Sequence, residues 1–459
     1  MADLPFGFST GANGDDDRDE RGDTPSGGPG ADPFGFTGGN FDMAGLGQMF
    51  SKLGEMFSGA GSAMTSGGPA SPVNYDLARK LAANSIGFVK PIPVATSSAV
   101  ADAVRLAETW LDGVTPLPAG STRAVAWTAA DWLDNTLDTW KRLCNPVAEK
   151  MSTMWASAMP EGAPQEAIAM AGPLTAMMAQ MGSMAFGSQL GQALGVLSQE
   201  VLTSTDIGLP LGPTGVAALM PDAVDAFGAG LEQPRSEVLT FLAAREAAHH
   251  RLFSHVPWLA PQLLSSVEAY AHGMKIDLSG MEELARNLDP SALSDSSRLE
   301  ELLSQGNLLE PTITPEQTSA LERLETTLAL IEGWVQTVVQ QALGDRLPGT
   351  SALSETLVRR RATGGPAEQT FGTLIGLELR PRKMREAAAL WQKLTDAVGA
   401  DKRDDLWAHP DLLPSADDLD PPAAFIDRVV GGDTSGIDQA LADLEKDFNT
   451  GPADSDNPS

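Results

Sequence analysis

Residues 243–259, AAREAAHHRLFSHVPWL, form the segment from which the organisation of this chain is worked out. Ser236 and Glu237 before it suit a helix N-cap and first turn, and Pro257 ends the helix near residue 255. The sequence therefore predicts a helix over about 237–255. Positions at three- and four-residue steps share one face of it, namely Leu239, Leu242, Glu246, His249 and Phe253.

The centre of this helix reads Arg245-Glu246-Ala247-Ala248-His249, one residue away from H-E-x-x-H. In that signature two histidines one turn apart bind the same zinc ion, and the glutamate activates the zinc-bound water. Arg245 stands where the first histidine would be. A guanidinium stays protonated and has no lone pair to donate, so Arg245 cannot bind zinc.

Composition favours helices over sheets. The chain has 459 residues, of which 42% are hydrophobic and only 6% aromatic. Many of the apolar residues are Ala, Leu or Met, which are common in helices. We expect a mainly α fold with at most a small β element.

Charge and cysteine usage exclude several functions. A net charge of −30 repels nucleic acid and disfavours anionic membrane surfaces, since both are bound through Lys and Arg. Cys144 is the single cysteine, which excludes an intramolecular disulfide and cysteine-based metal sites. The N-terminal residues lack the basic and apolar regions of a secretory signal. These features predict a cytoplasmic protein.

The chain divides into three regions by composition. Residues 1–72 are rich in Gly and Asp and are expected to be disordered, except for a short amphipathic helix near 41–58. There LGQMFS (46–51) is repeated as LGEMFS (53–58), so this segment is a candidate to dock on a partner or on the chain's own cleft. Residues 73–430 are predicted to form a helical domain, and 431–459 an acidic, mostly disordered tail.

Residues 167–199 carry no charge. Ser183, Gly187, Gly191 and Gly195 stand four apart, a spacing that lets two helix backbones approach closely. A membrane span is one interpretation. Pro173 and several glutamines favour the other, a buried central helix of a soluble core.

Local signals mark other elements. Thr314, Pro315 and Gln317 form the pattern of a helix start with a capping box. The Gly and Pro residues of 204–215 predict a loop, and VRRRATGG (358–365) is expected to end a helix. Three tryptophans on periodic apolar faces are expected in the core, namely Trp127, Trp132 and Trp140.

Several separated stretches together resemble a known family. They are HRLFSHVPWL, LLSSVEAYAHG, LALIEGW and DDLWAHPDLLPSADDLDPPAAFI. With them the chain, from about Tyr75 to Asp427, resembles the actinobacterial zincin-like metallopeptidase family, type 2. The resemblance implies a mostly helical, zincin-like metallopeptidase fold whose active helix carries H-E-x-x-H.

The resemblance also implies roles for individual residues. Glu246 matches the general base and His249 the second zinc ligand. A later helix is expected to supply an acidic ligand, for which Glu332 is favoured and Glu268 is the alternative. Histidines that could replace the missing first ligand are His250, His255 and His272.

Three functional hypotheses follow. The first is a non-catalytic, metal-free descendant that keeps the cleft for a peptide or protein ligand. In it Arg245 replaces the zinc ion and pairs with Glu332, with Glu246 as a second candidate partner. The second is an active zinc-dependent metallopeptidase or hydrolase that uses Glu246 as base and a substitute ligand. The third is a membrane-associated helical protein that uses 167–199.

Overall fold

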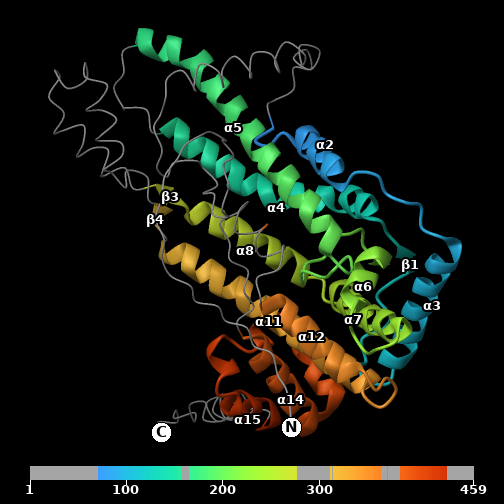
Figure 1. The fold of residues 1–459 in the computed structure, drawn as a ribbon. Helices are drawn as coiled ribbons and strands as arrows, with labels where there is room; N and C mark the ends of the chain where they lie inside the picture. Colours follow the sequence, from blue (N-terminus) through green and yellow to red (C-terminus); the bar gives the residue numbers. More distant parts are fainter. Residues whose placement is uncertain are drawn as a thin grey trace, which may run out of the picture. The chain divides into compact units, whose positions relative to one another are not determined.

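The computed structural model describes residues 71–157, 165–276, 311–312, 314–362, 370 and 383–431. All of them belong to one of two contact units in the chain, Ser62–Ser459. These residues are mainly helical, as composition predicts (Figure 1). The helix expected near 41–58 and the tail after residue 431 lie outside the described residues.

The helices follow one another along the chain with short strands between them. The N-terminal half contains α2 (Tyr75–Ile86), α3 (Val94–Leu111), β1 (Arg123–Ala126), α4 (Ala129–Ser157), α5 (Gln165–Glu200), β2 (Val216–Leu219) and α6 (Pro221–Gly228). The C-terminal half contains α7 (Arg235–His255), α8 (Leu259–Gly273), β3 (Lys275–Ile276), β4 (Pro311–Thr312), α11 (Pro315–Leu343), α12 (Thr350–Ala362), α14 (Met384–Asp405) and α15 (Ala423–Gly431).

Helix α7 carries the segment with which the sequence analysis began, and its central part is buried. Every residue from Val238 to Leu252 is buried, because α3, α11, α12 and β2 all pack against this helix. The predicted end at His255 is confirmed. The predicted cap is wrong: the helix begins at Arg235, after Pro234, and no side chain caps it. The extended backbone of Pro234 lets the helix start one residue before Ser236.

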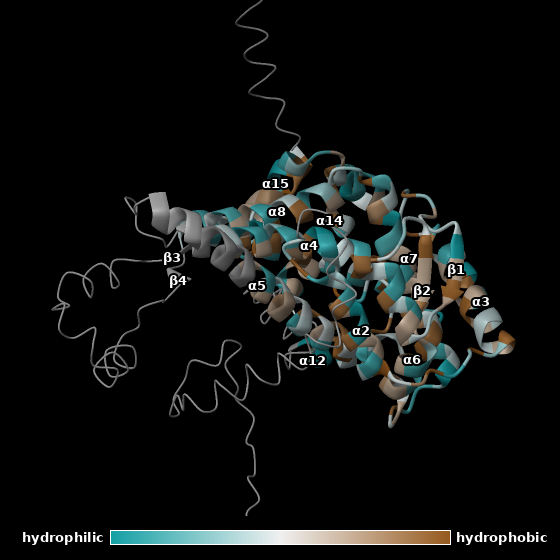
Figure 2. Cartoon of the chain, turned by 90° about the horizontal axis from the view of Figure 1, so that it is seen from above, coloured by the Kyte–Doolittle hydropathy of each residue, from teal (hydrophilic) through white to brown (hydrophobic). Residues whose placement is uncertain are grey.

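A small parallel sheet lies beside α7. Strands β1 and β2 pair in parallel, with Arg123 opposite Val216 and Ala126 opposite Leu219. All four residues of β2 are buried, and Figure 2 shows this strand in the hydrophobic colours. The loop predicted for 204–215 leads directly into β2. Strands β3 and β4 form a separate antiparallel pair. The expectation of a small β element is therefore confirmed.

The small residues of α5 allow close packing against α2. A Cβ atom added to Gly187 or to Gly191 would lie 2.5 Å from a backbone oxygen of Asn74 or Ala78. Only glycine permits this approach of the two backbones. For the part of α5 whose side chains are described, residues 179–200, the further expectation of a buried central helix is wrong. One face there is buried and the other exposes apolar side chains such as Val196, which is 49% exposed.

Helix α11 crosses α7, α8 and α14. Its predicted capping box is confirmed: Thr314 Oγ1 accepts from the Gln317 amide, and Gln317 Oε1 accepts from the Thr314 amide. Gly333 lies against the backbone of α14, since an added Cβ would come within 2.7 Å of the Ala388 nitrogen. The three tryptophans expected in the core are buried.

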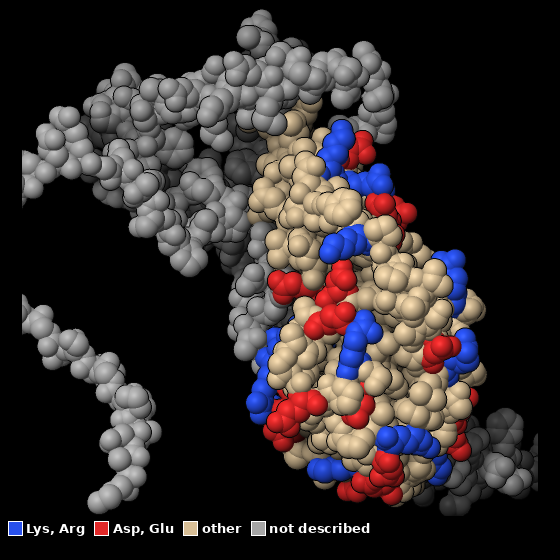
Figure 3. All heavy atoms as spheres, turned by 45° about the vertical axis from the view of Figure 1, so that its right-hand side comes forward, with Lys and Arg blue, Asp and Glu red and all other residues tan. Residues whose placement is uncertain are grey.

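The surface view in Figure 3 shows Lys and Arg side chains interspersed with Asp and Glu side chains on the visible face. Several of these charges form exposed ion pairs, such as Arg79 with Asp134. Within the described ranges, we find no helix with the length and apolar character needed to cross a membrane.

Candidate functional site

Three of the residues singled out in the sequence meet between α7 and α11. The Arg245 guanidinium lies 2.5 Å from Glu332 Oε2, and His249 Nε2 lies 3.0 Å from Glu332 Oε1. Arg245 is 7% exposed, His249 2% and Glu332 3%, so all three are shielded from water. We name these residues, together with Arg361, the Glu332 cluster.

Arg361, at the end of α12, is the member that sequence reasoning missed. Its guanidinium lies 2.5 Å from the same Glu332 oxygen and also donates to the backbone oxygen of Asp206. The side chain of Asp206 lies 3.7 Å from Arg361 and 3.3 Å from Arg360. The prediction that 358–365 ends a helix is confirmed, but one of the three arginines there turns inward.

Glu332 is held as a carboxylate. Burial by itself raises the pKa of a carboxyl group, but the charges of Arg361, His249 and Arg245 bring the pKa of Glu332 well below its usual range. Burial lowers the pKa of the Arg245 guanidinium, and Glu332 opposes that shift. The cluster is thus a buried anion surrounded by cations.

His249 is oriented by its own helix. Its Nδ1 lies 2.9 Å from the Arg245 carbonyl oxygen, which can only accept a hydrogen bond, so Nδ1 carries a hydrogen. Its Nε2 faces the Glu332 carboxylate, which also only accepts. The ring is thus held with Nε2, the nitrogen that would face a metal, directed at Glu332.

Glu246 lies apart from the Glu332 cluster and does not contact Arg245. Its carboxylate is fully buried and accepts hydrogen bonds from the Ser204 hydroxyl, the Thr205 hydroxyl at 2.6 Å, the Thr205 amide at 3.2 Å and the Ala218 amide at 3.0 Å. His250 Nε2 lies 3.2 Å away. Glu246 therefore anchors the loop before β2 and β2 itself to α7.

This arrangement does not suit a general base. Burial works to raise the pKa of Glu246, but hydrogen bonds from His250, Ser204 and Thr205 lower it to about 2. A general base works best with a pKa near the operating pH and within reach of a substrate proton. The carboxylate of Glu246 has no exposed surface and its oxygens are already engaged.

The other candidate residues lie elsewhere. Glu268 on α8 is exposed. His272 is also exposed, and its Nδ1 lies 2.7 Å from the Glu268 backbone oxygen. His255 is exposed near the Ala119 oxygen, and His250 is engaged with Glu246. In the described parts of the chain, no three His, Cys, Asp or Glu side chains are grouped so that they could hold a metal ion.

The residues present do not fit zinc. A zinc site needs three or four protein donors, and the Glu332 cluster supplies two, His249 and Glu332. The remaining members, Arg245 and Arg361, are cations that donate to the same carboxylate. A divalent ion bound there would meet two guanidinium groups instead of a third ligand.

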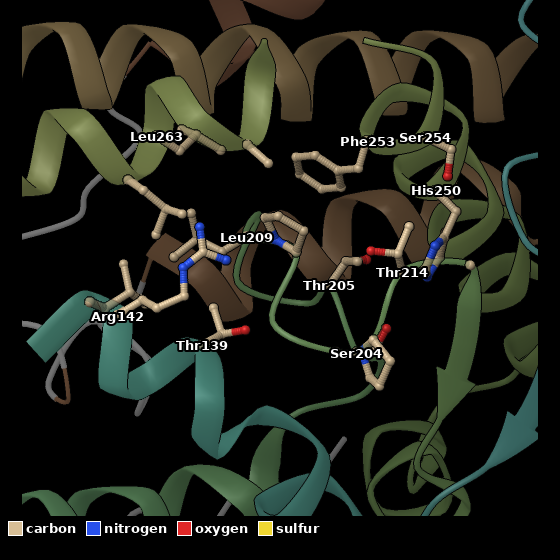
Figure 4. Close-up of a pocket in the computed structure, with 17 residues that line it drawn as sticks. Thr139, Arg142, Ser204, Thr205, Leu209, Thr214, His250, Phe253, Ser254 and Leu263 are labelled. Atoms are coloured by element: carbon tan, nitrogen blue, oxygen red, sulfur yellow. The ribbon is translucent and has the colours of Figure 1, made fainter. Parts of the chain in front are cut away.

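A cavity opens beside the anchor of Glu246. It has a volume of about 170 Å³ and lies between α4, the loop before β2, α7 and α8 (Figure 4). Ser204, Thr205 and His250, which hold the Glu246 carboxylate, form part of its wall. We name this cavity the α4–α8 pocket.

Comparison with known proteins identifies the family of this chain. Residues 73–426 match the model of the family described as zincin-like metallopeptidase. The chain belongs to the zincin-like metallopeptidase family. The family assignment made from the sequence is thereby confirmed. No curated protein matches the chain.

The fold of this zincin-like chain is also seen in a crystal structure of a "putative hydrolase with a novel fold" from Chloroflexus aurantiacus. The two share 18% sequence identity with a TM-score of 0.54, and the match covers 78% of this chain and 98% of the other. At this identity the likeness concerns the fold alone.

Proposed function

We propose that this member of the zincin-like metallopeptidase family is metal-free and non-catalytic, and that it acts as a binding protein. One observation carries the proposal: the buried Glu332 carboxylate, which the family resemblance suggests as a zinc ligand, pairs with Arg245 and Arg361. Arg245 occupies the position of the first histidine of H-E-x-x-H, so its side chain takes the place of both a ligand and the ion.

Electrostatics support the proposal. Two unit charges 4 Å apart interact with about 4 kcal/mol at an effective dielectric constant of 20, so a divalent ion near one guanidinium is repelled by about 8 kcal/mol. Two guanidinium groups contact Glu332. With two donors in place of three or four, less coordination energy is available to offset this repulsion.

The state of Glu246 supports a non-catalytic role independently. Its pKa of about 2 and its complete burial leave it ionised but out of reach of a substrate. The fold nevertheless keeps a pocket beside the helix that carries the motif. A chain whose described residues offer no zinc site and no free base, but which has this pocket, is suited to binding a peptide or protein ligand without cleaving it.

Zinc binding tests the proposal directly. The full-length protein, Arg245→His and His249→Ala are each equilibrated with excess zinc, passed over a desalting column and measured for zinc by mass spectrometry. Glu268→Gln serves as a control for removing an exposed carboxylate. We expect only trace zinc in the unmodified protein, and no cleavage of a random peptide library in zinc-containing buffer.

The opposite result is equally clear. About one zinc per chain in the unmodified protein, lost in His249→Ala but kept in Glu268→Gln, would show that another residue completes the site. The metal-free part of the proposal would then be wrong, and cleavage of the peptide library by this protein would show a zinc-dependent hydrolase. Zinc uptake by Arg245→His alone would support the replacement of the ligand by arginine.

A further inference from the structure

The α4–α8 pocket has polar and apolar sides. Its apolar side is built from leucines and a phenylalanine, namely Leu143, Leu209, Leu263, Leu264 and Phe253. The hydroxyl groups of the other side are largely engaged as donors: Ser204 and Thr205 to Glu246, Thr139 to the Leu211 oxygen, and Ser254 to the Gly120 oxygen. These hydroxyl groups are therefore not available to donate to a ligand, and a charged ligand group needs another residue of the wall as its partner.

Arg142 supplies that partner. It is exposed on α4, and Figure 4 shows its guanidinium directed away from the helix toward Leu209. Among the described residues it has no ion pair or hydrogen bond, in a chain whose net charge is −30. The neighbouring Lys141, by contrast, pairs with Asp138 at 2.8 Å.

The charge of the wall selects the sign of the ligand. None of the residues lining the pocket is Asp or Glu, so an amino group would find no counter-charge there. A guanidinium offers a planar fork of donors that matches a carboxylate with two parallel hydrogen bonds. The pocket is thus built for one carboxylate next to an apolar group.

Size selects the kind of molecule. The volume of about 170 Å³ holds about six water molecules at ~30 Å³ each. Pockets for complete small-molecule ligands usually measure about 300–1,000 Å³. The α4–α8 pocket therefore fits the end of a longer chain, which carries a carboxylate and one branched apolar side chain.

We propose that the α4–α8 pocket binds the carboxyl-terminal residue of a peptide. Arg142 pairs with the terminal carboxylate, and an apolar side chain such as that of leucine lies against Leu209, Leu263 and Phe253. This inference rests on the proposed function, since it names the ligand class of the same binding protein. The pocket wall itself does not include any member of the Glu332 cluster.

Fluorescence anisotropy tests this assignment on the full-length protein with EDTA present. The probe is fluorescein-labelled Gly-Ala-Gly-Leu with a free carboxylate, compared with the same peptide ending in an amide. We expect the acid to bind about tenfold more tightly, as one charge-assisted pair provides. A peptide that ends in glycine should bind more weakly than the one that ends in leucine.

Two variants make the test specific. Arg142→Gln removes the cation that has no partner among the described residues, and we expect this variant to bind the acid and the amide equally. Lys141→Gln removes the same charge from the adjacent, paired position, and it should keep the preference for the acid. Arg142 has no partner among the described residues, so its replacement should not affect folding, which circular dichroism checks.

Several results would overturn the assignment: no binding of the acid peptide at millimolar concentration, equal binding of the amide, or a preference that survives in Arg142→Gln. Displacement by 4-methylpentanoate at the same affinity would assign the pocket to small carboxylic acids instead of peptides. Mass spectrometry of the probe after incubation with zinc keeps the two proposals distinct. A shortened peptide would refute the non-catalytic function, whereas the acid-to-amide ratio tests the pocket alone.

Discussion

Replacing Glu332 by glutamine removes the anion on which the Glu332 cluster depends. The carboxylate is 3% exposed and contacts Arg245 and Arg361 at 2.5 Å and His249 at 3.0 Å. Arg361 keeps its contacts with the backbone and side chain of Asp206. Arg245 is 7% exposed and has no second ion pair among the described residues. Glu332→Gln therefore leaves a buried guanidinium without a directly paired carboxylate, with only the more distant charge of Asp206 to stabilise it.

Breaking a buried ion pair by removing one partner costs about 3–5 kcal/mol. We expect Glu332→Gln to lower the free energy of unfolding by about 4 kcal/mol. For a domain of roughly 350 residues, with an unfolding entropy of about 2.1 cal/mol/K per residue, this lowers the Tm by about 5 °C. The control Glu268→Gln, at an exposed site, should change stability by less than about 0.5 kcal/mol.

Urea denaturation followed by tryptophan fluorescence measures the effect, and a double-mutant cycle assigns it to the pair. Arg245→Met removes the cation that Glu332→Gln leaves behind. The double variant should therefore lose less stability than the sum of the single variants, by about 1–3 kcal/mol. A single-variant loss under about 0.5 kcal/mol, or additive losses, would refute the reasoning.

Three further predictions follow from other contacts. Folding lowers the pKa values of Glu246 and Glu332, so the unfolded chain binds more protons than the folded chain below about pH 4.5. The free energy of unfolding, measured in urea titrations, should therefore be constant from about pH 5 to 7 and fall steadily toward pH 2, and Glu246→Gln should make this fall less steep. Gly191→Ala places a Cβ 2.5 Å from the Ala78 oxygen and should lower the free energy of unfolding by about 1–3 kcal/mol, whereas the Cβ of Gly182→Ala on the same helix meets nothing within 4 Å and should leave stability unchanged or raise it. Equal losses of stability in thermal unfolding would contradict the close packing of α2 and α5. Arg361→Met should lower the free energy of unfolding by about 3 kcal/mol, whereas Arg359→Met should hardly change it, because the Arg359 side chain is 76% exposed. The reverse order would show that Arg361 is not the inward arginine.

The helices could be predicted because their signals are local. The capping box at Thr314, the end of α7 before Pro257 and the glycine spacing of α5 each depend on residues a few positions apart. The pairing of β1 with β2 could not be predicted, because 123–126 and 216–219 are far apart in the sequence and come together only in the folded chain. The one-sided packing of α5 was missed because an uncharged helix gives no sign of which face is exposed.

The candidate site was predicted in part. The position of Arg245 in the motif and the family resemblance led to Glu332, and the structure brings the two residues together. Arg361 was missed because a basic run at a helix end normally interacts with solvent and the helix dipole. The one available signal was the polar run Ser204-Thr205-Asp206 within an apolar region, which supplies partners to Glu246 and Arg361.

Glu246 shows how a motif can survive with a different role. Its place after the first ligand position suggested a general base, but its oxygens hold the loop before β2 and the Ala218 amide. The helix is buried from Val238 to Leu252, so each of its polar side chains needs a hydrogen-bond partner. The pattern E-x-x-H does not indicate which residue that partner is.

Anomalous X-ray diffraction tests the central claim most directly. Crystals of the unmodified protein are grown with zinc, and data are collected on both sides of the zinc absorption edge. We predict no anomalous peak at His249 Nε2 or Glu332, with the Arg245 guanidinium in contact with the Glu332 carboxylate. A zinc peak bound by His249 and Glu332, with Arg245 displaced from the carboxylate, would contradict the replacement of the metal by arginine.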